Sequence, residues 1–450
     1  MHSLARSSAF IALAVAAALS APESHAGDSD SYGYGYGYGD DHGDSSRRRD
    51  RQIQVGPRPY YLIDGLDAGA LKDRLEKCKD EPVKRTDFSI AHRGAPLQFP
   101  EHTLESYTAA ARMGAGIVEC DVTFTSDATL VCRHAQNDLH TTTNILVSPL
   151  ASSCKAPFVP AVLGTTGNVL SPATAECRTS ELTLAQFKSL RGKMDALNPA
   201  ATTPQQFQGG TPSWRTDLYT GRGTLMTFAE SIALNKRLGV KHTPELKAGD
   251  PASIAAVFGS QERYAQALVD QLRAGGVRPR DAWPQSFNPN DVLYWVRNTA
   301  YGEQAMFLVD YDAGKDNLVL FDTTGKQLVT RAEQLAFFRE LRRAGVNIVA
   351  PSFTALLAVE GNRVVASQFA KDLKAMGFDL IGWSFERTDI RRGSAGVGGY
   401  YDFDPAGSAI RKDADMYKAL DALARDVKVI GMFSDWPATV SYYASCLNLR

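Results

Sequence analysis

The chain has 450 residues, of which 44% are hydrophobic, so it is long enough to bury a large core in one α/β domain or in several smaller ones. Its formal net charge at pH 7 is -1. Proteins that bind nucleic acids usually carry a strongly basic face, so this charge balance excludes DNA or RNA as an expected partner.

Residues 1–26 have the composition of a cleavable secretory signal peptide. A basic start is followed by an apolar run over 9–19 and by the small-residue ending Ser24-His25-Ala26. This run is too short to cross a bilayer as a helix, which favours a removed signal over the alternative of an uncleaved anchor. We therefore expect an exported protein, periplasmic or extracellular. No later run is long and apolar enough to span a membrane, so we expect no stable membrane insertion.

Residues 27–59 are rich in Gly, Tyr, Asp, Ser and Arg. A segment with so little apolar surface cannot offset the entropy lost on ordering it, so we expect a flexible leader. The alternating Tyr-Gly pairs are also compatible with attachment to a cell surface, which is the alternative interpretation. The folded domain is then expected over 60–450.

Short apolar runs alternate with segments of helical periodicity through the rest of the chain. Strands that alternate with helices predict a parallel sheet, and about eight such units predict a (β/α)8 TIM-type barrel. The predicted strands are 88–91, 117–124, 129–134, 240–246, 283–287, 305–310, 346–350, 379–384 and 428–433. The predicted helices include 103–113, 226–238, 261–274, 333–344, 366–376 and 415–425.

Two of these strands should form an antiparallel hairpin. The runs 117–124 and 129–134 are too close for a parallel crossover, which needs about a dozen residues. A two-residue turn would place His134 opposite Glu119, whereas pairing of Thr125 with Leu130 would place it opposite Asp121. We expect one of these two registers, which both put the histidine on the carboxylate face. A three-residue loop would turn it away.

Residues 141–224 are rich in Thr, Pro, Ala and Gly and show few strand signals. So long an irregular connection is usually functional or a small subdomain, and we expect a loop-rich insertion over the barrel mouth. Six cysteines permit disulfides in an exported protein and leave the pairing open. Cys154 with Cys177 would staple the insertion, and Cys78 with Cys446 would tie together the two ends of the folded region.

Acidic residues stand near the ends of two predicted strands that follow one another in the barrel. Glu119 and Asp121 project to one side, because side chains alternate along a strand. Glu245 has a similar place on the next barrel strand, followed by Lys247 as a candidate phosphate contact. Oxygen-only ligation suits Ca²⁺ or Mg²⁺, so the three carboxylates predict a site for one divalent cation. Either pair alone would more often be a solvated strand end, but both lie where barrels place their sites.

Two histidines at strand ends are candidates for proton transfer. His92 ends the first predicted strand, where Gly94 allows a sharp turn, and His134 ends the third. As a pair they can serve as general base and general acid, with the forked donors of Arg93 facing a phosphate. A lone histidine at a strand end is more often structural. Three histidines lack an equally good position and are predicted to be non-catalytic: His102, His140 and His242.

Trp383 ends a late strand, where its indole can form the floor beneath a small polyol or pack in the core, and both interpretations stay open. The region 90–134 contributes no thiolate or serine nucleophile to these strand ends. The combination of histidines and carboxylates therefore suggests metal-assisted phosphate chemistry.

A series of short motifs runs through the chain: His92-Arg93-Gly94, Pro100-Glu101-His102-Thr103, Glu119-Cys120-Asp121, His134, Thr141-Thr142, Glu245-Leu246-Lys247, Gln285-Ser286-Phe287, Trp383-Ser384 and Ser434-Asp435-Trp436-Pro437. In this order they resemble the glycerophosphodiester phosphodiesterase family over most of residues 88–440. The resemblance implies a (β/α)8 barrel with a small insertion after the second histidine. It also implies these roles: Glu119, Asp121 and Glu245 as cation ligands, His92 and His134 as the acid/base pair, Arg93 and Lys247 on the phosphate, and Trp383 beside the glycerol.

Three positions depart from the family pattern. Members usually carry Asp directly after the second histidine, where it would orient the imidazole, and this chain has Ala135. His102 stands where Asn is commoner, and His140 stands where Arg is frequent. None of these changes removes a predicted ligand or a predicted catalytic histidine.

The resemblance implies metal-dependent hydrolysis of small-molecule glycerophosphodiesters to glycerol 3-phosphate and an alcohol. One alternative is a related barrel phospholipase of the sphingomyelinase D kind, for which the insertion is too polar. The other is a non-catalytic secreted binding protein on the same barrel, suggested by Ala135. The motifs leave open which histidine is the acid, which alcohol leaves, which of Ca²⁺ and Mg²⁺ binds, and the oligomeric state.

Overall fold

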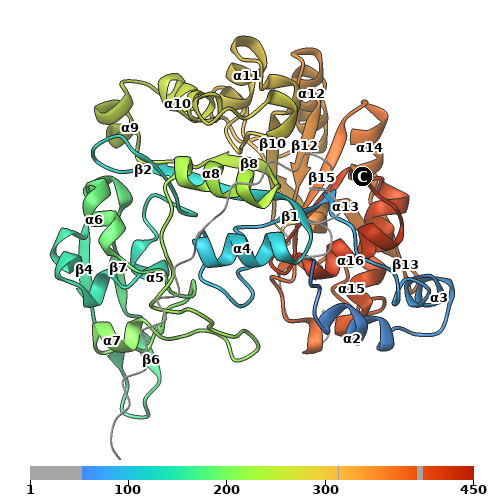
Figure 1. The fold of residues 1–450 in the computed structure, drawn as a ribbon, viewed down its shortest axis with the longest axis horizontal. Helices are drawn as coiled ribbons and strands as arrows, with labels where there is room; N and C mark the ends of the chain where they lie inside the picture. Colours follow the sequence, from blue (N-terminus) through green and yellow to red (C-terminus); the bar gives the residue numbers. More distant parts are fainter. Residues whose placement is uncertain (1–52, 313, 393–398) are drawn as a thin grey trace, which may run out of the picture. The chain divides into compact units, whose positions relative to one another are not determined.

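The computed structural model describes residues 53–312, 314–392 and 399–450 (Figure 1). The predicted signal over 1–26 and most of the predicted leader over 27–59 lie outside these residues. Helix α2 (Arg58–Asp64) already begins within the predicted leader and buries Leu62 and Ile63. This helix therefore begins before residue 60, where the folded domain was expected to start.

Parallel strands close into a barrel, as the alternation of strands and helices predicts. They are paired in the order β1-β16-β15-β12-β10-β9-β8-β2, and β1 pairs with β2 to complete the ring. The barrel strands are β1 (Thr86–Ala91), β2 (Ala115–Phe124), β8 (Lys241–Leu246), β9 (Gln285–Ser286), β10 (Met306–Asp312), β12 (Ile348–Pro351), β15 (Asp379–Phe385) and β16 (Gly431–Ser434). Each of them overlaps a predicted strand.

Helices connect consecutive barrel strands, so the architecture is a (β/α)8 barrel (Figure 1). The main helices are α4 (Leu104–Arg112), α8 (Phe228–Leu238), α10 (Gln261–Ala274), α11 (Pro289–Asn298), α12 (Arg331–Arg343), α14 (Gln368–Ala375), α15 (Met416–Ala422) and α16 (Ala438–Cys446). Shorter elements are α3 (Ala70–Glu76), α9 (Pro251–Phe258), α13 (Phe353–Leu356), β11 (Asn317–Val319), β13 (Leu357–Glu360) and β14 (Arg363–Ala366). None of the described helices is long and apolar enough to cross a membrane.

Local sequence sets the helix starts. Thr227 and Glu230 form a capping box at the start of α8, in which each side chain bonds the backbone N–H of the other residue. Thr330 and Glu333 do the same for α12. These reciprocal bonds satisfy N–H groups that a helix leaves unpaired, which explains why both helices begin there.

The side chains of β2 point alternately to two different hydrophobic cores. Every residue of β2 is buried, as expected for a strand covered on both faces. Val118, Cys120 and Val122 belong to the large outer core between the strands and the helices. Ile117 belongs instead to the small core inside the barrel. Side chains two residues apart share a face, so Glu119 and Asp121 point toward the barrel interior near its carboxyl end.

The predicted hairpin is present, but both predicted registers are wrong. Strand β3 (Leu130–Cys132) pairs antiparallel with β2, with Val122 opposite Cys132. A three-residue loop joins them, because the N–H of Thr125 donates to the carbonyl of Thr129 at 3.0 Å. Since β3 ends at Cys132, His134 lies beyond the ladder and the register does not determine where its side chain points.

The loop of this hairpin is fixed by a carboxylate that the register argument ignored. Asp127 accepts hydrogen bonds from the hydroxyl of Thr125 at 2.5 Å and from the N–H of Leu184 at 3.1 Å. Ala128 adopts a left-handed conformation with φ 63°. The tip is thus held by a contact with a distant residue of the chain, which local pairing rules do not predict.

The chain between β3 and α8 forms a separate group of short elements, drawn in teal and green in Figure 1. It has its own hydrophobic core, which includes Phe187 and Phe207. The elements are α5 (Leu139–Thr142), β4 (Ala156–Val159), β5 (Val162–Leu163), β6 (Val169–Ser171), β7 (Thr174–Glu176), α6 (Leu184–Ser189) and α7 (Pro204–Phe207). We call this stretch, residues 133–227, the mouth segment.

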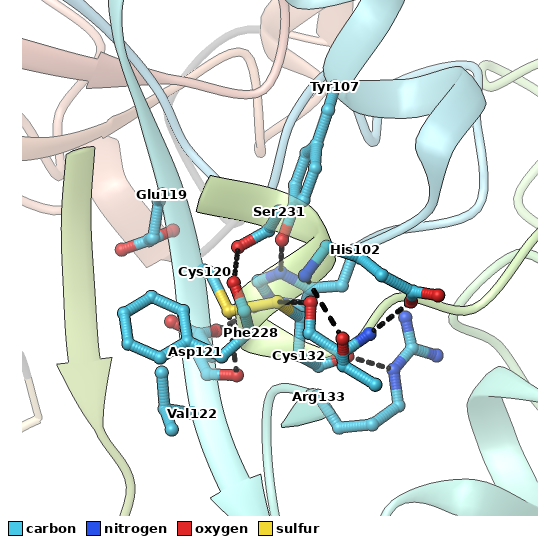
Figure 2. Close-up of a disulfide and its surroundings, with 12 residues drawn as sticks. His102, Tyr107, Glu119, Cys120, Asp121, Val122, Cys132, Arg133, Phe228 and Ser231 are labelled. Carbon is cyan, nitrogen blue, oxygen red and sulfur yellow. Dashed lines mark hydrogen bonds and ion pairs between the residues drawn. A yellow bond between two sulfur atoms is a disulfide. The ribbon is translucent and has the colours of Figure 1, made fainter. Parts of the chain in front are cut away.

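All six cysteines are paired. Both suggested disulfides are present, Cys78–Cys446 and Cys154–Cys177. A third disulfide, Cys120–Cys132, joins β2 to β3 and was not predicted. Figure 2 shows it between the two strands, near Phe228 and Ser231. This crosslink fastens the strand that carries Glu119 and Asp121 to the strand that precedes His134.

Candidate active site

The three carboxylates predicted as ligands converge at the carboxyl ends of β2 and β8. Asp121 and Glu245 are direct partners in the ladder between these strands, and Glu119 lies two residues before Asp121 on the same face. One carboxylate oxygen from each lies within 4.8 Å of the others, and all three residues are buried. The structure thus brings the three predicted ligands together.

The negative charges of these three carboxylates repel one another. Burial, together with the charges of Asp121 and Glu245, raises the pKa of Glu119 well above its usual range. Burial also raises the pKa of Glu245 to about 7. Burial opposes the charge of Asp121 as well, but His102 and Lys247 outweigh it and hold the pKa of Asp121 well below its ordinary value.

Two buried oxygens at this place accept no hydrogen bond from the described residues: Oδ1 of Asp121 and Oε1 of Gln285. Gln285, from β9, uses its Nε2 to donate to Oε1 of Glu119 at 2.8 Å. Unpartnered buried oxygens beside mutually repelling carboxylates fit a hard cation, which takes oxygen ligands only. The donor set therefore suits a divalent cation such as Ca²⁺ or Mg²⁺.

The two cationic side chains predicted to contact phosphate lie among these carboxylates. Lys247 places Nζ 2.6 Å from Oε1 of Glu245. Arg93 donates its backbone N–H to Oε2 of Glu119 at 2.8 Å and its Nη1 to Oε2 of Glu101 at 2.9 Å. Both cations are thus at the edge of the acidic cluster, where they partly balance its charge.

The turn after β1 is sharp, as the glycine in the motif predicts. Gly94 has φ 95°, and a side chain there would collide with Ser106, whose Oγ would lie 2.4 Å from an added Cβ. Arg93 itself has φ 55°, an unusual conformation for a residue with a side chain. This turn directs the N–H of Arg93 to Glu119 and brings His92 to the barrel mouth.

His92 is held by a carboxylate that directly follows the last barrel strand. Its Nδ1 lies 2.5 Å from Oδ1 of Asp435 and 2.9 Å from Oγ of Ser384. Burial opposes the charge of Asp435, but Arg387 and His92 hold its pKa near 2, so the carboxylate accepts the Nδ1–H. Nε2 is then left without a proton in the neutral imidazole and lies 4.0 Å from Oε2 of Glu119.

His134 reaches the same region by a bend after β3. Burial lowers the pKa of its imidazole well below the usual value, and the facing charges of Arg93 and Lys247 lower it further. One ring nitrogen lies within 4.8 Å of carboxylate oxygens of Glu101 and Asp138. The structure therefore brings His134 to the cations and carboxylates of the site, although the hairpin register does not place it there.

His102 was predicted to be non-catalytic because it lacks a position at a strand end as good as those of His92 and His134. In the structure its Nε2 lies 2.9 Å from Oδ2 of Asp121, and its Nδ1 lies 2.9 Å from the hydroxyl of Tyr107. Figure 2 shows this imidazole between the two residues. The side chain is fully buried, and its Nε2 is directed at Asp121.

Trp383 packs in the core, which is one of the two interpretations left open for it. Its Nε1 donates to the carbonyl of Ala350 at 2.8 Å, and the half-buried ring packs on the inner barrel core. Phe287 and Tyr400 stand nearly perpendicular to it, at 85° and 81°. The indole thus forms an aromatic wall at the mouth while its donor is used in the core.

Sequence reasoning assigned no role to several polar residues of the site. Gln285 and Asp435 belong to the motifs named above. Their positions at strand ends indicate functional residues, because barrel enzymes place their sites there. Asp138 gave a weaker signal as a carboxylate four residues after His134. Arg387 and Asp195, described further below, carried no recognisable pattern.

The fold and the site together define a barrel protein of the hydrolase type, with an acidic cluster and two histidines at the carboxyl ends of its strands. The chain belongs to the Glycerophosphoryl diester phosphodiesterase family, whose family model matches residues 92–439. Membership of this family supports a hydrolase activity on phosphodiesters.

Several individual proteins are also similar to this chain. An "Extracellular protein" of Arthroderma benhamiae is 39% identical over 260 residues, which cover 57% of this chain and 100% of that protein. "Glycerophosphodiester phosphodiesterase GDPD6" of Arabidopsis thaliana is 24% identical over 280 residues, 60% of this chain and 64% of that protein. The structure of a phosphodiesterase from Oleispira antarctica, solved with sn-glycerol-3-phosphate, has a TM-score of 0.45 and 17% identity, covering 79% and 95% of the two chains.

Proposed function

We propose that this protein hydrolyses small-molecule glycerophosphodiesters to glycerol 3-phosphate and an alcohol, with a divalent cation and two histidines. The observation that carries the proposal is the meeting of Glu119, Asp121 and Glu245 beside the Nε2 of His92, in a chain of this family. A bound Ca²⁺ or Mg²⁺ would neutralise these carboxylates and polarise the phosphate.

His92 is suited to act as the base. Asp435 accepts the proton on Nδ1, which leaves Nε2 free to take a proton from the attacking hydroxyl. This hydroxyl belongs to water or to the glycerol of the substrate itself; in the second case a cyclic phosphate forms first, and water then opens it to glycerol 3-phosphate. A new phosphorus–oxygen bond forms to it as the bond to the alcohol breaks.

His134 then gives a proton to the leaving oxygen. His92 thus takes up one proton and His134 releases one. Its low pKa in the free protein comes from burial and from Arg93 and Lys247. A bound anionic phosphate would offset these charges and favour the protonated imidazole. Arg93 and Lys247 would orient the phosphate through their charges.

Asp138 takes the place of the carboxylate that the family usually has at position 135. It accepts the N–H of Ala135 at 3.0 Å and lies close to the imidazole of His134. We therefore assign to Asp138 the orientation of His134. This assignment removes the reason that Ala135 gave for a non-catalytic binding protein.

An exported location is part of the proposal. All six cysteines form disulfides, which persist in oxidising compartments. The similar Arthroderma protein is named as extracellular, and residues 1–26 have the composition of a signal peptide. The secreted or periplasmic protein is thus the form that should be assayed.

The test is release of glycerol 3-phosphate from glycerophosphocholine and glycerophosphoethanolamine, with and without chelator. Wild type should lose activity in chelator and regain it with Ca²⁺ or Mg²⁺, whereas Glu119→Ala should be inactive in both. Glu176→Gln is the matched control, because it breaks a surface ion pair with Arg178. Chelator-insensitive turnover would contradict the proposed ligands, and turnover of lipid micelles alone would favour the phospholipase alternative.

A further inference from the structure

A series of ion pairs connects His92 to the mouth segment. Oδ1 of Asp435 lies against Nδ1 of His92, and Oδ2 of Asp435 accepts from Nη1 of Arg387 at 3.0 Å. Nη2 of the same guanidinium donates to Oδ2 of Asp195 at 2.6 Å. One arginine therefore divides its donors between a carboxylate that follows β16 and a carboxylate of the mouth segment.

Asp195 has a second cationic partner on its other oxygen. Nη2 of Arg215 lies 2.5 Å from Oδ1 of Asp195 and also donates to the carbonyl of Pro96, in the turn after β1. The side chains of Asp195 and Arg215 are only 11% and 8% exposed. Charges this well screened from water are held by their partners and not by solvent.

The backbone around Asp195 is also fixed. Lys193 is buried and directs its ammonium into the loop that carries Asp195. Its Nζ donates at 2.6, 2.7 and 2.6 Å to three backbone carbonyls, those of Thr141, Met194 and Ala196. Carbonyls on both sides of Asp195 are thus tied to one cation, so the carboxylate is presented in a defined position.

The mouth segment is closely packed on the turn that carries Glu101 and His102. A Cβ added at Gly192 or at Gly223 would lie 2.8 Å from Cγ2 of Thr103, so the two glycines allow close backbone approach. Thr103 also forms a bridge with Leu225. Asp195 therefore belongs to a segment that is docked against the barrel.

We propose that Asp195 is a positioning residue for His92, acting through Arg387 and Asp435. The mouth segment then contributes a residue to the support of the site. Without the charge of Asp195, Nη2 of Arg387 loses its anionic partner and the guanidinium is free to leave Asp435. The imidazole of His92 would no longer be held with Nε2 toward the acidic cluster. The kinetic part of this inference rests on the proposed function.

The first test is Asp195→Asn, which keeps the shape of the side chain and removes its charge. We expect kcat for a glycerophosphodiester to fall about 10- to 100-fold, because a small misplacement of a reacting group has effects of this size. KM should change little, since Arg387 and Arg215 occupy both carboxylate oxygens of Asp195. A fall confined to KM, or no change, would overturn the proposal. Glu176→Gln, in the same segment, is the control and should match wild type.

A double-mutant cycle separates positioning from a general loss of stability. If Asp195 acts only through Arg387, the variant Asp195→Asn/Arg387→Met should be no slower than Arg387→Met alone. Two effects that multiply would show that Asp195 works by another route. If Asp195→Asn does not fold, Arg387→Lys serves instead, because it keeps the charge and loses the fork that joins the two carboxylates. Arg387→Lys with wild-type kcat would overturn the proposal.

Proton NMR tests the same geometry without any turnover. The Nδ1–H of His92 in its short bond to Asp435 should give a strongly downfield resonance, assigned by its loss in His92→Asn. We expect Asp195→Asn to shift or broaden it, while Glu176→Gln leaves it in place. An unchanged resonance in Asp195→Asn would refute the positioning role. Absence of phosphodiesterase activity in the wild type, with this shift present, would refute only the proposed function.

Discussion

His102 holds Asp121 through a hydrogen bond of 2.9 Å between its Nε2 and one carboxylate oxygen. Its other nitrogen is 2.9 Å from the hydroxyl of Tyr107, so the ring is fixed from both ends. The other oxygen of Asp121 has no hydrogen-bond partner in the described chain and is the oxygen left for a cation. His102, which the sequence predicted to be non-catalytic, thus supports the proposed cation ligand Asp121.

Replacing this imidazole should therefore weaken cation binding. We expect His102→Ala to lower the affinity for Ca²⁺ or Mg²⁺ about 10- to 100-fold, the usual effect of losing a group that orients a metal ligand. Calorimetric titration of the metal-free protein measures the affinity directly. His140→Ala is the control, because that ring stacks on Phe207 in the mouth segment. Unchanged affinity in His102→Ala would show that Asp121 is oriented without it.

The acidic cluster should lower the stability of the metal-free protein. Burial and the charges of Asp121 and Glu245 raise the pKa of Glu119, so its ionised form is unfavourable in the folded state. We expect Glu119→Gln to raise the Tm measured in chelator by a few degrees. The amide of Gln285 can turn its unpartnered Oε1 toward the new side chain.

The same variant should not respond to the cation. Added Ca²⁺ or Mg²⁺ should raise the Tm of wild type, because a ligand that binds only the folded state stabilises it. Glu119→Gln should show little or no rise and no hydrolysis. A variant that gains as much Tm from the cation as wild type would argue against Glu119 as a ligand.

Asp138 should be needed for full activity although it is not a proposed cation ligand. Burial raises the pKa of Asp138 to about 7, and Asp138→Asn keeps an acceptor for the N–H of Ala135 but removes the ionisable carboxyl group beside His134. We expect kcat to fall at least about 10-fold, since an imidazole without its orienting carboxylate transfers protons poorly. Asn137→Ala, at an exposed neighbouring position, is the control. Equal kcat in Asp138→Asn and wild type would leave His134 without a carboxylate partner in the mechanism.

His242 should make the protein less stable in acid. Burial lowers its pKa to about 4, below the ordinary value of about 6.5 in an unfolded chain. Between these values the unfolded chain binds more protons, so the free energy of unfolding falls as the pH drops below about 6.5. The full effect of the shift is ~3 kcal/mol, reached near pH 4.

His242→Gln should remove this part of the acid sensitivity. Chemical denaturation of both proteins at pH 7, 5.5 and 4.5 measures it as a smaller loss of unfolding free energy in the variant. Other groups titrate equally in both proteins and cancel in the comparison. The same loss in wild type and variant would mean that His242 takes up its proton in the folded state as easily as in the unfolded state.

Local patterns in the sequence were sufficient to predict the barrel and the proposed cation ligands. Alternation in β2 separates Glu119 and Asp121 from Val118 and Val122, and this depends only on the geometry of one strand. The register between β2 and β3 could not be predicted in the same way. The loop between these strands is held by Asp127, which binds the N–H of Leu184, far away in the chain.

The order of residues alone determined which side chains lie at strand ends and on which face, because period and strand direction are local properties. Only the tertiary structure decided which partners hold them. Asp435 meets His92 across 343 positions, and Arg387 joins Asp435 to Asp195 of the mouth segment. Such pairings depend on how distant segments pack in three dimensions, since buried charges must find partners wherever the fold brings them.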